Sequence, residues 1–135
     1  MAESFSFELV SPEKLLLADN VEMVVVPGAE GDFGVLTGHS PLVSSLRPGV
    51  IDTYNGDKVE KRIFVAGGFA EVTRERCTVL AEEAVAVEDI DSGVAQDRVK
   101  AANEAISVAE NDTARNGAET ELAVAEAMLS AGSLT

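Results

Sequence analysis

Few residues of this chain could do chemistry, and the densest group lies in residues 27–42, where four glycines lead to the only histidine, His39. A glycine-rich loop can hold phosphate with its backbone N–H groups. The spacing of Gly28, Gly31 and Gly34 matches neither GxGxxG nor GxxxxGK[ST], and no lysine follows where phosphate would need it. We therefore predict a tightly turned sheet edge, better suited to docking than to phosphate binding.

His39 is followed by Ser40, an arrangement that could pair a base with a nucleophile. Adjacent residues of an extended chain point to opposite faces, and the segment lacks the second glycine of a GxSxG elbow. One histidine without a companion His or Cys also cannot complete a zinc site of three or four protein ligands. We expect His39 to lie in a turn or an interface and to hydrogen-bond to the backbone.

The other reactive side chains lack the partners that catalysis needs. Cys77 heads an apolar run and is predicted to be a small buried hydrophobe. The acidic pairs Glu82-Glu83 and Asp89-Asp91 accompany no histidine and no metal-ligand cluster. We interpret them as solvated faces and helix-start charges, so the sequence predicts no catalytic residue, no metal site and no cofactor.

The elements that must position these residues change in type near residue 88. Before that point, short runs that alternate apolar and polar residues are separated by turn residues, which predicts β-strands. Asn55-Gly56 is a strong hairpin signal. Many short strands with no long helix between them predict an antiparallel sandwich or barrel. The predicted strands are 4–10, 21–26, 34–36, 42–46, 49–54, 59–66, 69–72 and 77–81.

Residues 88–135 are predicted to be helical, because they contain many alanines and no proline or aromatic residue. Asp91 or Ser92 can cap a first helix that extends to about residue 109. Residues 111–117 are predicted to be a loop, and Asn116 with Glu119 has the form of a capping box for a second helix. Small alanines favour close packing of two antiparallel helices, an αα-hairpin. The predicted apolar stripes comprise Val94, Ala95, Val99, Ala102, Ala105 or Ile106, and Ala109 in the first helix, and Ala118, Leu122, Ala125 and Leu129 in the second.

Charge restricts the partners. The chain carries 24 acidic and 10 basic residues, a formal net charge of −14, which disfavours nucleic acid and anionic lipid. No run approaches the roughly 18 to 20 apolar residues of a membrane-spanning helix, so any membrane association is expected to pass through another protein. A single cysteine and an N-terminal segment without the features of a leader peptide indicate a protein that works in the cytoplasm.

Five motifs follow one another along the chain: LVSP at 9–12, GxxGVLxGHxPL at 31–42, LRPG at 46–49, FVxGGFxEV at 64–72 and VLA at 79–81. In this order they resemble the motifs of one family, the epsilon subunit of bacterial F-type ATP synthases. The resemblance covers essentially the whole chain. It implies a mainly β, α+β fold with an antiparallel β-sandwich of about ten strands in residues 1–87, followed by a helical hairpin in residues 88–135.

The same resemblance implies a function. The chain would be a non-catalytic rotor subunit of the central stalk, coupling rotation of the c-ring and the gamma subunit to ATP synthesis. It would be peripheral at the cytoplasmic face of the inner membrane, below the alpha and beta subunits of the catalytic head. The implied contacts with the c-ring are Glu30, Gly31, Asp32 and Phe33, and those with the gamma subunit are His39, Pro41 and Leu42.

Two departures from the family's pattern concern regulation. Some relatives bind ATP through an Ile/Leu-Asp-x-x-Arg-Ala motif, of which this chain keeps Ile90, Asp91 and Ala95 but has Val94 at the arginine position. The charge that would face phosphate is missing, so we expect ATP binding to be weak or absent. No basic residue follows Arg115 in the second helix, so we expect a mainly structural hairpin with a vestigial regulatory role at most.

Two other hypotheses remain open at this stage. A free-standing acidic β-sandwich adaptor that binds a different basic protein would explain the charge and the glycine-rich edges equally well, although it has no reason to carry the ordered motifs. A small acidic enzyme would need a nucleophile with its base, a metal cluster or a cofactor loop.

Overall fold

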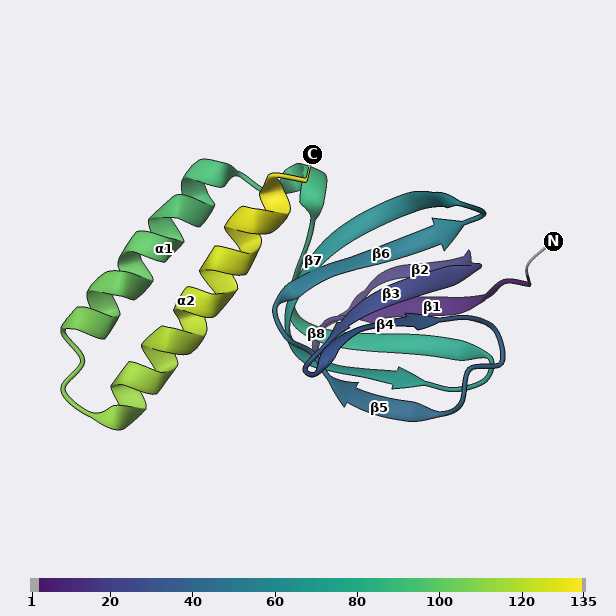
Figure 1. The fold of residues 1–135 in the computed structure, drawn as a ribbon, viewed down its shortest axis with the longest axis horizontal. Coiled ribbons are helices and arrows are strands. Elements are labelled where there is room, and N and C mark those ends of the chain that lie inside the picture. Colours follow the sequence, from purple (N-terminus) through teal and green to yellow (C-terminus); the bar gives the residue numbers. More distant parts are fainter. Residues whose placement is uncertain (1–2, 135) are drawn as a thin grey trace. The chain divides into compact units, whose positions relative to one another are not determined.

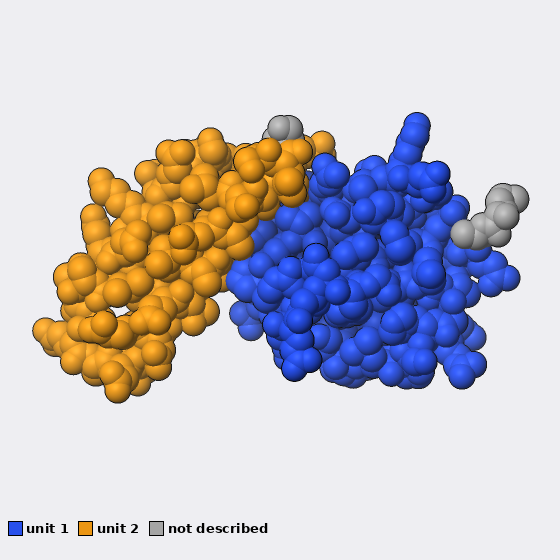
Figure 2. All heavy atoms as spheres, in the orientation of Figure 1, with its two compact units in different colours: residues 1–86 blue, residues 87–135 orange. Residues whose placement is uncertain are grey.

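The computed structural model describes residues 3–134, which form eight β-strands, one 3-10 turn and two α-helices (Figure 1). The chain separates into two compact units, residues 1–86 and residues 87–135 (Figure 2). The strands are β1 (Phe5–Val10), β2 (Leu15–Val21), β3 (Met23–Gly28), β4 (Gly31–Val35), β5 (Leu42–Ser45), β6 (Gly49–Asn55), β7 (Lys58–Val72) and β8 (Arg76–Ala86). The 3-10 turn is η1 (Val87–Asp89), and the helices are α1 (Ser92–Ser107) and α2 (Asp112–Gly132).

The first unit is a β-sandwich made by one continuous hydrogen-bonded path of strands. Their order is β2-β1-β8-β7-β6-β3-β4, with β5 paired to β7 outside this path. All neighbours are antiparallel except β1 and β8, which are parallel. The long strand β7 belongs to both layers, because its first part pairs with β6 and its last part pairs with β5 (Figure 1).

The bend in β7 depends on two glycines. Gly67 and Gly68 have φ values of 73° and 103°, in the region that only glycine adopts easily. A Cβ on Gly68 would lie 1.8 Å from the carbonyl oxygen of Leu80. The sequence predicted two separate strands on either side of this pair, and that prediction was wrong: the glycines bend the strand without ending its pairing with β8. This is one reason why the sandwich has eight strands rather than about ten.

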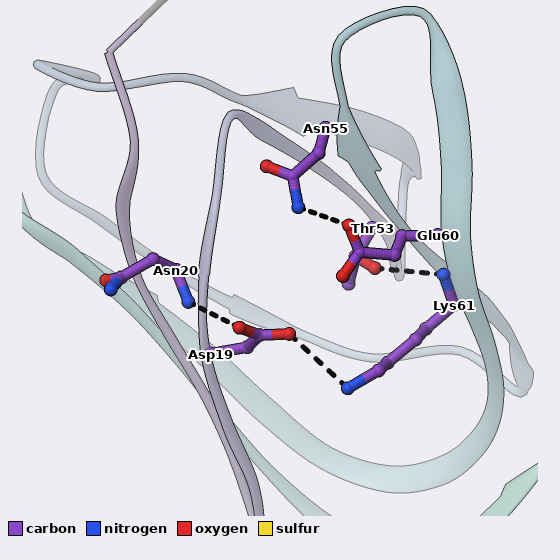
Figure 3. Close-up of polar contacts among 6 residues, drawn as sticks. All are labelled: Asp19, Asn20, Thr53, Asn55, Glu60 and Lys61. Atoms are coloured by element: carbon purple, nitrogen blue, oxygen red, sulfur yellow. Dashed lines mark hydrogen bonds and ion pairs between the residues drawn. The ribbon is translucent and has the colours of Figure 1, made fainter.

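The core lies between the layers and takes alternate residues of the strands, among them the fully buried Phe7. Thr53 is the one buried polar residue of the described chain, and its Oγ1 accepts a hydrogen bond from the backbone N–H of Lys61 at 3.1 Å. Figure 3 shows that the same lysine reaches Asp19 of β2, with Nζ 3.3 Å from Oδ2. One polar cluster therefore connects β2, β6 and β7.

The second unit is an αα-hairpin whose first helix begins as predicted. The side chain of Asp91 accepts hydrogen bonds from the backbone N–H groups of Gly93 (2.8 Å) and Val94 (3.2 Å). Val94, however, is 55% exposed and lies outside the packed stripe. The buried residues of the two helices are Ala95, Ala102, Ala118, Ala125, Met128 and Ala131.

The predicted start of the second helix was wrong. Helix α2 begins at Asp112, because Asn111 is its N-cap and accepts a hydrogen bond from the N–H of Ala114 at 2.8 Å. The predicted loop, including Asn116, is therefore the first part of the helix. Gly117 is tolerated there, since it lies in open space, and Asp112 places a favourable negative charge in the first turn.

Candidate functional site

The glycine-rich segment forms the hairpin between β3 and β4, and we call residues 29–32 the β3–β4 tip. Gly28 pairs with Gly31, whose φ of 139° suits glycine alone, so two residues, Ala29 and Glu30, make the turn. Residues 29–32 are all exposed, whereas Gly28 is buried. Phe33, predicted to lie in the same contact set, is half-buried and packs against the core.

Arg47 holds the β3–β4 tip from a distant part of the chain. Its Nη1 donates to the carbonyl oxygen of Gly28 (2.8 Å), and its Nη2 donates to Oδ1 of Asp32 (2.5 Å). Its backbone N–H donates to the carbonyl oxygen of Pro27 (3.0 Å), and the N–H of Ala29 donates to that of Ser45 (2.8 Å). The tip and the residues at its base are therefore connected to the end of β5 and to Arg47 after it, by backbone bonds and by both arms of one guanidinium group.

Close backbone contacts leave the base of the tip little room to move. A Cβ on Gly28 would lie 2.8 Å from the carbonyl oxygen of Gly31 and 2.9 Å from the ring of Phe33. A Cβ on Gly49 would lie 2.8 Å from Cβ of Pro27. Both positions need glycine for close packing, which explains why glycines occur here without any phosphate-binding pattern.

His39 lies in a separate turn after β4. The N–H of His39 donates to the carbonyl oxygen of Leu36 (3.1 Å), and Gly38 has a φ of 83°, the geometry of a type II turn. The ring Nδ1 of His39 hydrogen-bonds to the carbonyl oxygen of Ser40 at 2.7 Å. The predicted backbone hydrogen bond is confirmed, and the ring is not paired with the serine hydroxyl.

The structure does not bring the two predicted contact sets together. The β3–β4 tip lies at one end of β4 and His39 lies beyond the other end, a separation of about 16 Å along a strand of this length. Pro41 is exposed beside His39, while Leu42 is half-buried and packs on the core. Two separate surfaces are therefore available for contact.

A third surface was missed at the sequence level. In the strand register, Phe69 pairs with Leu80, Leu80 with Val10, and Val10 with Leu15, so these four side chains form a row across β7, β8, β1 and β2. The row lies on the face away from the core, and Phe69 and Leu15 are 43% and 54% exposed. We call it the outer-sheet row. In the sequence, a residue of this row can be recognised as an apolar residue that directly follows a core residue, as Val10 follows Leu9 and Leu80 follows Val79.

Polar residues lie beside the outer-sheet row. A shallow cleft is lined by Glu71, Thr73, Glu75, Arg76 and Thr78. Glu8 accepts a hydrogen bond from the hydroxyl of Thr78 (3.5 Å) and lies 3.7 Å from Nη1 of Arg76. A partner at this face would therefore meet apolar side chains bordered by carboxylates.

Within the described residues, the Cys77 thiol and the Asp52 carboxyl have shifted pKa values, and neither forms a reactive site. Burial raises the pKa of the Cys77 thiol to about 12, so it stays protonated and unreactive, as predicted for a small buried hydrophobe. Burial also raises the pKa of Asp52. The positive charge of Arg62 opposes that rise in pKa, and the negative charge of Asp32 adds to it. Within residues 3–134, no group of three or more His, Cys, Asp or Glu side chains could hold a metal ion.

The remnant of the ATP-binding motif serves the helices. Asp91 caps α1 through its carboxylate, and Ala95 is buried. Ile90 packs against the end of α2, where a Cβ on Gly132 would lie 3.0 Å from it. Capping and packing therefore account for Ile90, Asp91 and Ala95 without a bound nucleotide.

Comparison with known proteins identifies the family. Residues 4–87 match the family described as ATP synthase, Delta/Epsilon chain, beta-sandwich domain. The chain is 53% identical over 131 residues to the ATP synthase epsilon chain of Rhodospirillum rubrum, with 97% of this chain and 98% of that one covered. It is 55% identical to the epsilon chain of Paramagnetospirillum magneticum, with the same coverage.

Solved structures show the same fold. A chain of the Euglena gracilis mitochondrial ATP synthase structure of OSCP, F1 and c-ring superposes with a TM-score of 0.81 at 26% identity, covering 97% of this chain and 82% of that one. A chain from the Tetrahymena thermophila mitochondrial ATP synthase central stalk and c-ring has a TM-score of 0.70 at 12% identity, which shows the fold alone. The resemblance seen in the motifs is confirmed, and this chain belongs to the ATP synthase epsilon chain family, whose members are non-catalytic subunits of that complex.

Proposed function

We propose that this chain is the central-stalk rotor subunit of a proton-translocating F-type ATP synthase, which couples rotation of the c-ring and the gamma subunit to ATP synthesis. The observation that carries this proposal is the match over nearly the full length of the epsilon chains. A sandwich with a continuous hydrogen-bonded path of strands is stiff enough to transmit torque.

The β3–β4 tip is the proposed contact with the c-ring. Glu30 and Gly31 are exposed at the turn, and Asp32 follows them, so the tip presents an acidic surface to polar loops that carry basic side chains. Phe33 supports the tip from the core side rather than contacting the ring directly. The close backbone packing at its base supports this role, since a fixed loop loses little conformational entropy on binding.

The gamma subunit is the proposed partner of the second and third surfaces. His39 and Pro41 lie beyond the far end of β4, and Leu42 anchors them to the core. The outer-sheet row adds apolar area, the usual centre of a stable protein interface. Contacts at the two ends of β4 would let residues 1–87 link the c-ring and the gamma subunit through one rigid strand.

Residues 88–135 are proposed to be mainly structural, without ATP binding. Helix α2 carries Glu119, Glu121 and Glu126 and no basic residue after Arg115, so it would be repelled by an acidic surface of the alpha and beta subunits. Val94 supplies no charge for phosphate.

We also propose that the subunit is peripheral at the cytoplasmic face of the inner membrane. None of the helices within residues 3–134 is long and apolar enough to cross a membrane. Membrane association would therefore depend on the c-ring and the other subunits.

Affinity capture tests the proposed function. The protein is tagged at its C terminus in its own cells and captured from detergent-solubilised membranes, and the eluate is assayed for ATPase activity and subunit composition. Recovery with active alpha, beta and gamma subunits and the c-ring is the expected result. Recovery alone, or with an unrelated basic protein, would instead favour the adaptor hypothesis.

A further inference from the structure

We propose that Arg47 is the positioning residue of the β3–β4 tip, and that Glu30, not Asp32, is the free acidic group that the tip offers to a partner. The inference rests on the proposed role of the tip in binding the c-ring. It goes further, because it assigns separate roles to Arg47, Asp32 and Glu30.

The positioning role follows from the bonds of one guanidinium group. Arg47 donates through Nη1 to the carbonyl oxygen of Gly28 at the base of the tip, and through Nη2 to Asp32 on its far strand. One planar group thus bridges both strands of the hairpin. Lysine could not make both bonds with the same geometry, because its ammonium group is a single point charge.

The charge assignment follows from the same contacts. The carboxylate of Asp32 lies 2.5 Å from a guanidinium nitrogen, so its charge is already paired within the chain. Glu30 is exposed at the turn, and its carboxylate has no hydrogen bond or ion pair to any residue in the range 3–134. A basic partner side chain would therefore meet Glu30 as an uncompensated charge.

The effect of Arg47 should be local. The side chains of Arg47 and Asp32 are 42% and 58% exposed, and ion pairs with this exposure add little to global stability. A bond that fixes a loop in its binding conformation acts mainly on loop order and affinity. Loss of Arg47 should therefore loosen the tip without unfolding the sandwich.

The chain offers a matched control for this substitution. Arg62 is 43% exposed, and its Nε lies 3.5 Å from Asp52. Arg62 belongs to β7 and pairs in register with Asp52 of β6, which in turn pairs with Val25 of β3. Its ion pair is with Asp52 and not with a residue of the β3–β4 tip. Arg47→Gln and Arg62→Gln thus remove the same charge from equally exposed positions, and only the first removes bonds to the tip.

The first measurement is backbone ¹⁵N relaxation of the isolated full-length protein. In Arg47→Gln, the order parameters of residues 29–32 should fall from about 0.85 to below about 0.6. Arg62→Gln should leave them unchanged, and Arg47→Lys should recover them in part. Unchanged tip order in Arg47→Gln would overturn the positioning role and leave the proposed function intact.

The second measurement is the affinity of each variant for ATP synthase stripped of this subunit. Arg47→Gln and Glu30→Lys should each weaken binding by about tenfold or more. The tip should be loosened in Arg47→Gln and should stay ordered in Glu30→Lys. Asp32→Asn should loosen the tip and weaken binding less than Glu30→Lys does. If Arg47→Gln loosens the tip while Glu30→Lys and Arg47→Gln both bind normally, the tip is not a contact and the charge assignment is wrong.

Discussion

The sandwich and the helical hairpin are stabilised by different kinds of residue. The core of the sandwich contains large side chains from distant parts of the sequence, such as Phe7 and Ile51, both fully buried. The buried residues of the helices are mostly alanines, and the ion pair of Arg98 with Glu121 links α1 to α2. Large buried side chains stabilise more than alanines do, so the sandwich should be the rigid part and the hairpin the marginal one.

The largest expected effect comes from emptying the sandwich core. Phe7→Ala removes a fully buried ring and should lower the free energy of unfolding by about 3–5 kcal/mol. Urea denaturation of the full-length protein, followed by the circular dichroism of the strands, measures this change. Phe69→Ala is the control, because its ring is 43% exposed and much less area is lost. Equal losses for the two variants would mean that the core is not the source of rigidity.

A smaller effect is expected from opening the ion pair of the hairpin. Both Nε and Nη2 of Arg98 donate to Oε1 of Glu121, at 3.1 and 2.5 Å, and the arginine side chain is 26% exposed. Arg98→Gln should destabilise the packing of α1 on α2 by about 1 kcal/mol. Amide hydrogen exchange should become faster in both helices and stay the same in β7 and β8. Faster exchange throughout the sandwich would contradict the separation of the two units.

A stabilising change in the sandwich should be smaller still. Thr37 is the second residue of the type II turn that ends at His39, a position at which proline matches the backbone conformation. Thr37→Pro should raise the free energy of unfolding by about 0.4–1 kcal/mol, reduced by loss of the exposed hydrogen bond to the carbonyl oxygen of Glu3. Thermal unfolding tests it, and a lower melting temperature would mean that the turn has a different conformation.

The smallest effect concerns the pH dependence of the sandwich. Burial raises the pKa of Asp52 above 3.8, so the folded protein binds this proton more tightly than the unfolded chain does. Between 3.8 and the raised pKa, this group therefore makes the fold less stable as pH rises. Asp52→Asn should remove that contribution and cost no stability at neutral pH. Marked destabilisation at pH 7 would show instead that the ion pair with Arg62 dominates.

The sequence predicted features that depend on neighbouring residues. Alternation places Phe5, Phe7 and Leu9 in the core, as expected. The Asn55-Gly56 signal corresponds to the β6–β7 hairpin, where Asn55 pairs with Lys58 and Gly56 has a φ of 70°. Asp91 caps α1 as predicted. Each of these features is determined by residues within one turn or one strand.

The missed features depend on contacts between distant residues. Leu15–Val21 was not recognised as a strand, because its leucines are consecutive and do not alternate with polar residues. The segment forms a strand by pairing with β1. Arg47 and Asp32 are separated by 15 residues, and no local pattern predicts their ion pair. The outer-sheet row joins four strands through their register. The start of α2 was placed too late, because Asn116 with Glu119 has the local form of a capping box while Asn111 is the residue that caps the helix.

The sandwich is proposed to couple the rotor, while the hairpin is mainly structural. This division of roles can be tested by adding the full chain, or the chain without residues 88–135, to ATP synthase stripped of this subunit. ATP-driven proton pumping and ATP hydrolysis are then measured together. We expect both forms to bind and to restore pumping, with hydrolysis little changed by the deletion. A several-fold rise in hydrolysis would contradict this division of roles, because the hairpin would then be an inhibitor.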